Sequence, residues 1–416
     1  MLIRWESGTK VALSDYSAGT SSCAAKGRIA HFFGRVERTL KIAVCAESEA
    51  GEMRVAATPD TVKRMLGLGA DIAVEPGAGV KSGILDADYA AAGASIAADA
   101  VAGADVVLKV RRPSAAELAR LRKGALVIAI MDPFGHEAAL KAMADAGIAA
   151  FAMELMPRIT RAQAMDVLSS QANLAGYRAV VEAAAEFGRA FPMMMTAAGT
   201  VPAAKVFVMG AGVAGLQAIA TARRLGAIVT ATDVRPAAKE QVASLGAKFI
   251  AVEDDEFKQA ETAAGYAKEM SKDYQAKQAA LVAEHIKKQD VVITTALIPG
   301  RPAPRLITRA MVASMKPGSV IVDLAVERGG NVEGARADEV ATIDGVKVVG
   351  YVNLAGRLAA SASALYAKNL YALLEILVDK QTKALAVKWD DDIVKATVLT
   401  RDGAVVHPNF APKSAA

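Results

Sequence analysis

The chain has 416 residues, of which 53% are hydrophobic and 22% charged, and its formal net charge is +5. A chain of this length suits two or three globular domains with large apolar cores. The positive charge is spread along the sequence, and no dense Lys/Arg tract alternates with aromatic residues, so nucleic-acid binding is not expected.

Residues 1–39 differ in character from the rest of the chain. They contain scattered Arg, Lys, Ser and Gly residues and show no sustained hydrophobic period. An Arg- and Ser-containing leader has features of a transit peptide, but Glu6, Asp15 and Glu37 argue against one. We therefore expect a disordered extension, or residues that precede the natural start of the chain.

From Leu40 onward, short apolar runs alternate with helical patterns. Thr58 and Pro59 have the pattern of a helix N-cap followed by a first-turn proline, and another helix is expected from about His136. Strands are expected at residues 40–45, 72–74, 106–108, 126–130 and 149–153. Alternating strands and helices are typical of a parallel α/β sheet, so the first half of the chain is predicted to form its own α/β domain.

A long helical pattern from about Ser170 to Phe191 is expected to connect two domains. Pro192 is expected to end it, and residues 192–203 then have the pattern of an apolar hairpin with glycine in the turn. A hairpin this apolar is not stable alone in water. We therefore expect it to pack on a second copy of the chain in a homodimer.

Residues 206–233 carry the most specific motif. Val206–Met209 is an apolar run of strand length, and Gly210-Ala211-Gly212-Val213-Ala214-Gly215 follows it and opens a helical pattern. A G-x-G-x-x-G between a strand and a helix, with an acid about 20 residues further on, is the dinucleotide-binding arrangement. Because the longest uncharged run of the chain is thus a strand, a turn and a helix, direct membrane insertion is not expected.

Each residue of this turn has an expected role toward a dinucleotide. Gly210 permits the tight turn, Gly212 lets the backbone approach a pyrophosphate, and Gly215 lets the helix pack close to the strand. The helix N-terminus, with Val213 and Ala214 in its first turn, offers N–H groups and positive potential to the phosphates. The alternative is a glycine-rich turn that binds no nucleotide.

Asp233 ends the next apolar run and is expected to accept hydrogen bonds from the adenosine ribose hydroxyls. A 2′-phosphate there would meet like charge, so NAD(H) is favoured over NADP(H). Arg235 softens this preference, because an arginine near this position can accommodate a 2′-phosphate. Val234, between them, completes the expected cofactor contacts of this segment.

Six apolar runs of the second half match a complete doubly wound sheet with the expected strand order 3-2-1-4-5-6. They are residues 206–209, 228–232, 249–252, 291–294, 320–324 and 346–349. The turn after the fourth run, with Thr295, Ala296 and Leu297, approaches the cofactor in such a sheet. The long connection over residues 254–289, with Gly265 in its first half, is either a lid over the ligand or a solvated loop that leads into an ordinary helix.

The tail is expected to return to the first domain, because the nucleotide domain needs no seventh strand. Arg401-Asp402-Gly403 is a hairpin signal, and a helix at 363–377 and strands at 384–389, 393–399 and 404–406 are expected around it. The prediction is two Rossmann-like doubly wound parallel-sheet domains joined by long helices, with a cleft between them. Their expected limits are residues 40–165 plus 357–416, and residues 166–356 with the linking helix and the hairpin.

The junction of the two expected domains carries amide, hydroxyl and charged side chains. If residues 158–170 are helical, Gln163, Asp166 and Ser169 or its neighbour share one face. The spacing equally fits a capping box of Thr160 with Gln163, with Asp166 favourably placed near a helix start. A nicotinamide needs amide and hydroxyl partners for its carboxamide and ribose, and this cluster offers them.

Two basic residues of the first domain permit a different chemistry. Arg54 and Lys109 could hold a substrate carboxylate and act as acid or base, and His136 could join them. Each alone is more often an ordinary surface or strand-end residue. The other three histidines have no partners at metal-ligand spacing, so no metal site is expected, and two cysteines without a disulfide framework fit a reducing compartment.

With these residues in view, the sequence from about Leu40 to Pro408 resembles the NAD(H)-binding component, domain I, of the proton-translocating nicotinamide nucleotide transhydrogenase family. It is similar to the bacterial form in which the alpha subunit is split and this soluble piece is a separate polypeptide. The resemblance rests on the Arg158/Gln163/Asp166 loop and on residues 151–158, 191–200, 265–270 and 294–299.

The resemblance implies roles for particular residues. In the family, an arginine, a glutamine and an aspartate hold the nicotinamide end of NAD(H), which carries over to Arg158, Gln163 and Asp166, with Ser169 beside them. A tyrosine of the family's mobile loop closes over the nucleotide, which carries over to Tyr266. The first 39 residues lie outside the resemblance.

The resemblance implies direct hydride transfer between NADH and NADP⁺ held on a partner domain, coupled to proton translocation by membrane-embedded partner subunits. The chain would be cytoplasmic and peripheral on the inner membrane through these partners. Alanine dehydrogenase shares the fold, and Arg54 and Lys109 match its substrate-binding residues, so an NAD-dependent amino-acid dehydrogenase is the alternative. Residues 131–136 depart from that enzyme's pattern, in which a histidine follows the strand more closely. A non-catalytic NAD-sensing module is the other alternative.

Overall fold

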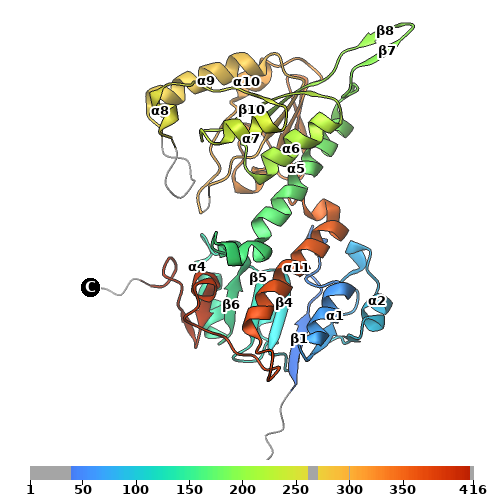
Figure 1. Cartoon of the computed structure of the whole chain (residues 1–416), viewed down its shortest axis with the longest axis vertical. Coiled ribbons are helices and arrows are strands. Elements are labelled where there is room, and N and C mark those ends of the chain that lie inside the picture. The colour runs from blue at the N-terminus through green and yellow to red at the C-terminus, as the bar shows by residue number, and fades with distance from the viewer. Residues whose placement is uncertain (1–38, 261–269, 299, 413–416) are drawn as a thin grey trace, which may run out of the picture. The chain divides into compact units, whose positions relative to one another are not determined.

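The computed structural model describes residues 39–260, 270–298 and 300–412. The extension expected at residues 1–39 lies outside these ranges except for Thr39, and so do Gly265 and Tyr266. The described strands form two large sheets and a separate two-stranded hairpin (Figure 1). The α/β class expected from the sequence is confirmed.

The first sheet has eight strands in the order β17-β16-β6-β5-β4-β1-β2-β3. They are β1 (Leu40–Val44), β2 (Ala70–Val74), β3 (Ser95–Ile96), β4 (Val106–Arg111), β5 (Leu126–Ile130), β6 (Ala149–Ala152), β16 (Val398–Arg401) and β17 (Ala404–Val405). The first six run parallel, whereas β16 pairs antiparallel with β6 and β17 antiparallel with β16. The sheet thus takes its strands from both ends of the described chain.

Helices cover both faces of this sheet. Successive strand residues point to opposite faces, and because both sets of side chains are apolar, both faces are buried. Ile42 and Val44 join one buried cluster, whereas Ala43 between them joins another with Leu140 and Met143. Thr58 caps the first helix as expected, with Pro59 at its start. The helical segments around the sheet are α1 (Pro59–Gly67), η1 (Val80–Ser82), α2 (Asp86–Ala91), α3 (Ala115–Leu118), α4 (Glu137–Asp145), η2 (Met153–Leu155) and α12 (Asp392–Thr397).

The tail differs from the sequence expectation in two places. The strand expected at residues 384–389 is absent apart from one bridge between Val378 and Leu385, because no described strand lies beside it to pair with. Residues 393–397, expected as strand, belong to helix α12, whose first turn is capped by the Asp391 carboxylate. The hairpin turn is confirmed, since Asp402 and Gly403 both have positive φ, 52° and 80°.

The second sheet has seven strands in the order β11-β10-β9-β12-β13-β15-β14. They are β9 (Lys205–Met209), β10 (Ile228–Thr232), β11 (Lys248–Phe249), β12 (Val291–Thr294), β13 (Val320–Asp323), β14 (Val340–Ile343) and β15 (Val346–Val349). The expected order 3-2-1-4-5-6 is confirmed for six strands, and β14 adds an antiparallel edge strand that was not expected. β11 is shorter than expected, because the Val252 N–H donates to the Gln278 side chain at 2.9 Å and not to a neighbouring strand.

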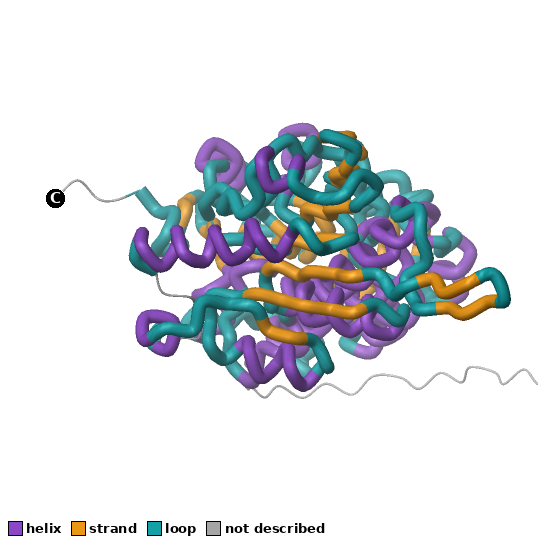
Figure 2. The backbone as a smooth tube through the Cα atoms, turned by 90° about the horizontal axis from the view of Figure 1, so that it is seen from above, coloured by secondary structure: helices purple, strands orange, loops and turns teal. Residues whose placement is uncertain are grey.

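The described residues around the second sheet, the nucleotide half of the sequence prediction, include six helical segments. They are α6 (Val213–Arg224), α7 (Ala238–Ser244), α8 (Asp255–Lys258), α9 (Lys272–Ile286), α10 (Arg309–Ala313) and η4 (Val326–Arg328). The connection expected as a lid or loop therefore contains α8 and α9 in its described parts. Figure 2 shows helices on both sides of the strands, as in a doubly wound sheet.

Two long helices link the two sheets: α5 (Val167–Glu186), preceded by η3 (Thr160–Met165), and α11 (Ala359–Leu377), preceded by η5 (Gly356–Leu358). α5 ends earlier than expected, at Glu186, because Phe187 is already extended with ψ 118°, so Pro192 does not end the helix. α5 packs closely on α6, since a Cβ at Gly176 would lie 2.0 Å from the Ala214 carbonyl oxygen. The start of the helix that follows the glycine turn therefore rests on the linking helix.

The hairpin is confirmed as β7 (Met194–Thr196) and β8 (Gly199–Val201), which pair only with each other. Figures 1 and 2 show it projecting beyond the rest of the nucleotide half. Met193, Met194 and Met195 keep 62%, 44% and 75% of their surface exposed. Three consecutive exposed methionines form an apolar surface that no other described part of the chain covers.

Candidate nucleotide site

The glycine turn, residues 210–215, joins β9 to α6 with glycine where other residues do not fit. Gly210 has φ 104°, and a Cβ there would lie 2.5 Å from the Thr295 hydroxyl. A Cβ at Gly215 would lie 1.8 Å from the Gly210 carbonyl oxygen. The first and third glycines are therefore required by the packing of the chain itself.

Gly212 is different, because a Cβ there would meet no atom of the described chain within 4 Å. Gly212 is the N-cap residue of α6, and no acidic residue lies in the first turn of this helix, which contains Val213 and Ala214. The open N–H groups and the helix dipole of a 12-residue helix favour an anion at this point. The space beside Gly212 is thus open at a helix end that favours an anion.

Asp233 lies at the end of β10 and holds the glycine turn from the side. Its Oδ2 accepts a hydrogen bond from the Ala211 N–H at 2.7 Å. Its Oδ1 accepts one from the Arg235 N–H at 2.9 Å. The acid thus ties the turn to the end of the neighbouring strand, in the position from which a ribose acid acts.

Arg235 covers the same carboxylate with its guanidinium. Its Nε lies 3.0 Å from Oδ1 of Asp233, a second guanidinium nitrogen lies 3.1 Å from Oδ2, and that nitrogen also donates to the Ala211 carbonyl at 3.2 Å. Val234, between the two, is exposed. The charge that would repel a 2′-phosphate is therefore partly neutralised in this structure.

The β12 loop, defined here as residues 295–298, lies against the glycine turn. The Thr295 N–H donates to the Met209 carbonyl at 2.9 Å, and its hydroxyl donates to the Gly210 carbonyl at 3.2 Å. Leu297 and Ile298 remain 53% and 45% exposed. The loop expected to approach the cofactor thus meets the turn and presents apolar side chains beside it.

Two buried polar residues of this region were not foreseen. Asn331 is fully buried and bonds through its side chain to Ala296, and Asp323 is fully buried at the end of β13. Burial raises the pKa of Asp323, against the hydrogen bonds from the Ala325 and Val332 N–H groups that lower it. A sequence signal existed for Asp323, because it ends an apolar strand as Asp233 does, whereas Asn331 follows two glycines and carries no periodic signal.

At the junction, Asp166 is the N-cap of α5. Its carboxylate accepts hydrogen bonds from the Ser169 N–H at 2.9 Å and from the Ser169 hydroxyl at 2.6 Å. The placement of Asp166 near a helix start is confirmed. The capping box of Thr160 with Gln163 is wrong, because η3 begins at Thr160 after Ile159, which makes no side-chain cap bond.

Arg158 and Gln163 are exposed residues of the segment before this cap. Gln163 lies in η3, whereas Asp166 has extended ψ 92°, so the two do not lie on one continuous helical face as they would if residues 158–170 were helical. The structure therefore brings Asp166 and Ser169 together and leaves the Arg158 and Gln163 side chains at the surface.

The two basic residues of the alternative chemistry are buried in ion pairs. Arg54, 4% exposed, donates to Glu52 at 2.6 and 2.7 Å and to the Gln171 side chain at 2.9 Å. Lys109, 1% exposed, lies 2.8 Å from Glu117 and 3.5 Å from a second buried acid, Glu47. Arg54 shares the Glu52 carboxylate with Arg111, whose Nε lies 2.8 Å from it, whereas Lys109 is paired with two acids.

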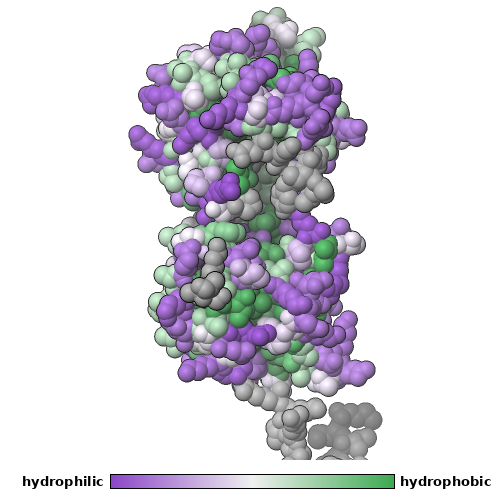
Figure 3. Space-filling model, turned by 90° about the vertical axis from the view of Figure 1, so that its left-hand side faces the viewer, coloured by the Kyte–Doolittle hydropathy of each residue, from purple (hydrophilic) through white to green (hydrophobic). Residues whose placement is uncertain are grey.

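The His136 Nδ1 lies 3.1 Å from the Phe134 carbonyl and 3.7 Å from Asp132. Over the described ranges, no group of three or more His, Cys, Asp or Glu residues could hold a metal ion. No helix within the same ranges is both long and apolar enough to cross a membrane. Figure 3 shows hydrophilic residues over much of one face, with apolar residues in scattered patches.

Comparison with known proteins agrees with this geometry. Residues 43–175 match the family described as alanine dehydrogenase/PNT, N-terminal domain, and residues 179–408 match alanine dehydrogenase/PNT, C-terminal domain. The chain is 55% identical over 384 residues to the first of the polypeptides that make up the NAD(P) transhydrogenase alpha subunit of Rhodospirillum rubrum, covering 90% of this chain and 100% of that protein. It is 32% identical to an alanine dehydrogenase of Halomonas elongata, covering 88% of this chain and 95% of that protein.

Solved structures show the same relationship. A transhydrogenase from Sinorhizobium meliloti is 65% identical with a TM-score of 0.81, covering 88% of this chain and 99% of that one. An L-alanine dehydrogenase, at 24% identity and a TM-score of 0.75 over 89% of this chain and 98% of that one, shares the fold. The chain therefore belongs to the alanine dehydrogenase/PNT family.

Proposed function

We propose that the chain is the NAD(H)-binding component of a proton-translocating transhydrogenase. In this proposal it takes part in direct hydride transfer between NADH and NADP⁺ held on a partner domain. The observation that carries the proposal is the glycine turn, with open space at Gly212 and a fixed acid at Asp233. The similarity to transhydrogenase alpha subunits supports it.

The adenosine end would be held by the turn and by Asp233. The α6 N-terminus would hold the pyrophosphate beside Gly212, and Asp233 would accept hydrogen bonds from the ribose. Because the Asp233 carboxylate already accepts from Ala211 and Arg235, it is fixed before a ligand arrives. A fixed acceptor loses little conformational freedom on binding, which favours affinity.

The nicotinamide end would be held by Arg158, Gln163, Asp166 and Ser169. Asp166 is oriented by its bonds to Ser169, and the exposed Gln163 amide is available to a carboxamide. The role of Tyr266 in closing the site against water is proposed from the resemblance alone, since Tyr266 lies outside the described residues.

Positioning would dominate the chemistry of this site. Bound NADH supplies a hydride that passes directly to NADP⁺, which needs no acid or base, only reacting atoms within about 3–3.5 Å in aligned geometry. Arg158, Gln163 and Asp166 would orient the ring. Their effect should therefore appear in the rate of transfer more than in affinity.

A stand-alone amino-acid dehydrogenase is disfavoured by the ion pairs of the first half. Such an enzyme needs a cation for the substrate carboxylate, but Arg54 is buried in an ion pair with Glu52 and Lys109 in ion pairs with Glu117 and Glu47. Moving either cation toward a substrate would break a buried ion pair, at a cost of several kcal/mol. The buried pairs thus favour transhydrogenase over the alternative.

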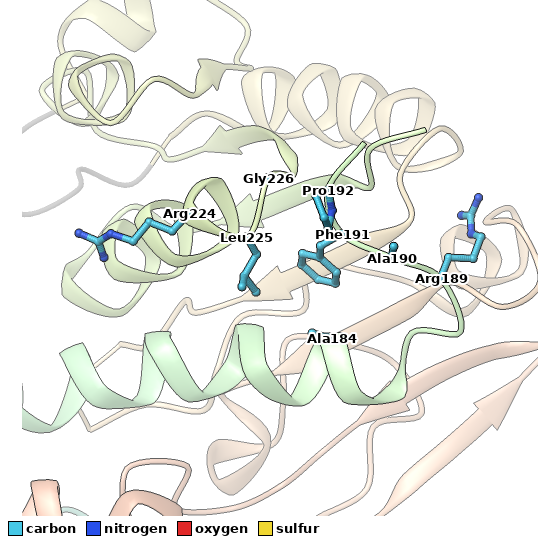
Figure 4. A pocket seen from close by; sticks show the side chains of 8 residues that line it. All are labelled: Ala184, Arg189, Ala190, Phe191, Pro192, Arg224, Leu225 and Gly226. Carbon is cyan, nitrogen blue, oxygen red and sulfur yellow. The ribbon is translucent and has the colours of Figure 1, made fainter. Parts of the chain in front are cut away.

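The exposed hairpin supports a homodimer. The residues that lead into the hairpin pack on the turn after α6. A surface hollow of about 500 Å³ at this point is lined by Ala184, Arg189, Ala190, Phe191, Pro192, Arg224, Leu225 and Gly226. Figure 4 shows Phe191 and Leu225 pointing toward α5 while the two arginines point away at either end. A second copy would cover this apolar surface and the three methionines. Light scattering at micromolar concentration should give a dimer, and a clean monomer would refute this component of the proposal.

Proton translocation would be carried out by membrane-embedded partner subunits, to which this chain would bind peripherally at the inner membrane. The test is reconstitution with an NADP(H)-binding partner domain, followed by an assay of hydride transfer from NADH to an NADP⁺ analogue. Transfer that requires both proteins supports the proposal. NADH binding without transfer would indicate a sensing module, and reduction of NAD⁺ by alanine without a partner would indicate the dehydrogenase.

A matched pair of variants sharpens this assay. Gln163→Asn shortens the amide by one methylene and should slow transfer far more than it weakens NADH binding. Gln241→Asn makes the same change on the exposed surface of α7 and should alter neither. Equal losses of binding and transfer in Gln163→Asn would argue against a ring-positioning role.

A further inference from the structure

The Asn331 side chain holds the β12 loop in place through hydrogen bonds to the loop backbone, and we call these bonds the Asn331 clamp. Its Oδ1 accepts the Ala296 N–H at 3.0 Å, and its Nδ2 donates to the Ala296 carbonyl at 2.9 Å and to the Pro304 carbonyl at 2.8 Å. The side chain is fully buried. One amide thus satisfies both backbone groups of Ala296, as a neighbouring strand would, and fixes the loop at two points.

Asn331 is itself held in place. Its carbonyl accepts the N–H groups of Leu306 and Ile307 at 2.8 and 3.0 Å. The next residue, Val332, donates its N–H to the buried Asp323 carboxylate at 3.0 Å. The position of Asn331 is therefore fixed near the end of β13 by contacts outside the β12 loop.

The β12 loop that Asn331 fixes leaves apolar side chains exposed to solvent. Ala296 is followed by Leu297 and Ile298, which remain 53% and 45% exposed, although a less constrained loop could turn such side chains inward. The β12 loop follows the fourth strand of the sheet and so belongs to its second mononucleotide half. The glycine turn and Asp233 belong to the first half, which takes the adenosine end.

We propose that Asn331 is a positioning residue for the nicotinamide half of the dinucleotide. By fixing Ala296, it holds Leu297 and Ile298 as the apolar surface against which that half of the ligand packs. The three hydrogen bonds of the Asn331 side chain described above all go to the protein backbone. The inference rests on the proposed function, because it requires a dinucleotide at the glycine turn.

Two probes separate the halves of the ligand without the hydride-transfer reaction. NADH carries the nicotinamide, whereas ADP-ribose carries the adenosine, the pyrophosphate and a ribose without it. Asn331→Ala should weaken NADH binding roughly tenfold, which corresponds to the loss of about one hydrogen bond, and leave ADP-ribose binding unchanged within about twofold. Isothermal titration of the full chain with each probe measures both dissociation constants.

Gln289→Ala is the matched control. Gln289 is a buried amide that donates to the His285 carbonyl at 3.1 Å, just before the amino end of β12, so its loss removes a comparable side chain far from the loop. Both probes should bind this variant as they bind the parent chain. Leu297→Ser changes an exposed side chain and should leave the fold intact. It should reproduce the selective loss of NADH affinity.

The titrations have four results that would count against the inference or the proposed function. Equal losses for both probes in Asn331→Ala would show a merely structural role, and no loss for either would overturn the inference, as would wild-type NADH affinity in Leu297→Ser. Failure of the parent chain to bind ADP-ribose or NADH would refute the proposed function as well. A parent chain that binds both, with variants that do not distinguish them, would refute only the role of Asn331.

Discussion

Gly212→Ala should separate binding from stability at the glycine turn. A Cβ at this position meets nothing within 4 Å, and the φ of −74° and ψ of −169° suit any L-residue. Replacing glycine by alanine in a compatible conformation restricts the unfolded chain and stabilises the fold by about 0.4–1 kcal/mol. Alanine is a poorer N-cap residue than glycine, which offsets this gain, so we expect the Tm to stay within about 2–4 °C of the parent value.

The same methyl group should weaken nucleotide binding, because it projects into the space that the pyrophosphate needs. Displacing the phosphates from the α6 N-terminus would lose about one charge-assisted hydrogen bond, which contributes about 1.5–3 kcal/mol. The expected result is a roughly 10- to 100-fold rise in the dissociation constant for NADH. Binding would thus fall while stability stays nearly the same.

Fluorescence titration with NADH and thermal unfolding check both expectations. Gly188→Ala is the control, since a Cβ there also meets nothing within 4 Å but lies after α5, away from the turn. Its NADH affinity should be unchanged, and its Tm should stay the same or rise by about 1–4 °C. Gly215→Ala should lose both stability and binding, because its Cβ would lie 1.8 Å from the Gly210 carbonyl oxygen. Wild-type NADH affinity in a folded Gly212→Ala variant would refute the assignment of the phosphate site.

Three further predictions follow from other contacts. Arg235→Ala uncovers the Asp233 charge and removes a nearby cation, so the ratio of the NADPH to the NADH dissociation constant should rise roughly tenfold, and an unchanged ratio on titration with both nucleotides would contradict this. Burial disfavours the charged form of Glu52, but Arg54 and then Arg111 outweigh it and lower the pKa of Glu52 from 4.5 to about 2. Its contribution to stability, roughly 3 kcal/mol, should therefore be complete above about pH 4.5 and be lost as the pH falls toward 2, and in urea unfolding Glu52→Gln should remove this component of the acid dependence. Gly176→Ala places a Cβ 2.0 Å from the backbone of α6 and should lower the free energy of unfolding by about 1–3 kcal/mol or more, so unchanged denaturant stability would show that α5 and α6 pack less closely.

The regular elements were predictable because their signals are local. Apolar runs such as those of β5 and β12 are buried on both sides and read as continuous hydrophobic segments in the sequence. The glycine turn follows such a run and precedes a helical period, so its position and the strand order were expected. The run at residues 384–389 carries the same local signal but has no strand to pair with, which no local pattern reveals.

The contacts that shape the candidate site were harder to predict. Asp166 has a spacing that fits both a helix cap and a ligand contact, and only the folded structure shows that its carboxylate caps α5. Gly176 and Asn331 act on residues more than 30 positions away in sequence, so their roles depend on tertiary packing. The pairing of Arg54 with Glu52 changes an apparent substrate-binding cation into an internal one. The domain limits and the individual ligand contacts stay predictions.

Direct hydride transfer is tested most directly by an isotope label. The chain is mixed with an NADP(H)-binding partner domain, an NADP⁺ analogue and NADH that carries deuterium at the transferred C4 position, and the product is analysed by mass spectrometry. The proposal predicts that the reduced NADP⁺ analogue carries the deuterium and that solvent hydrogen does not replace it. A reduced product without the label, or no reduction although NADH is bound, would contradict the proposal.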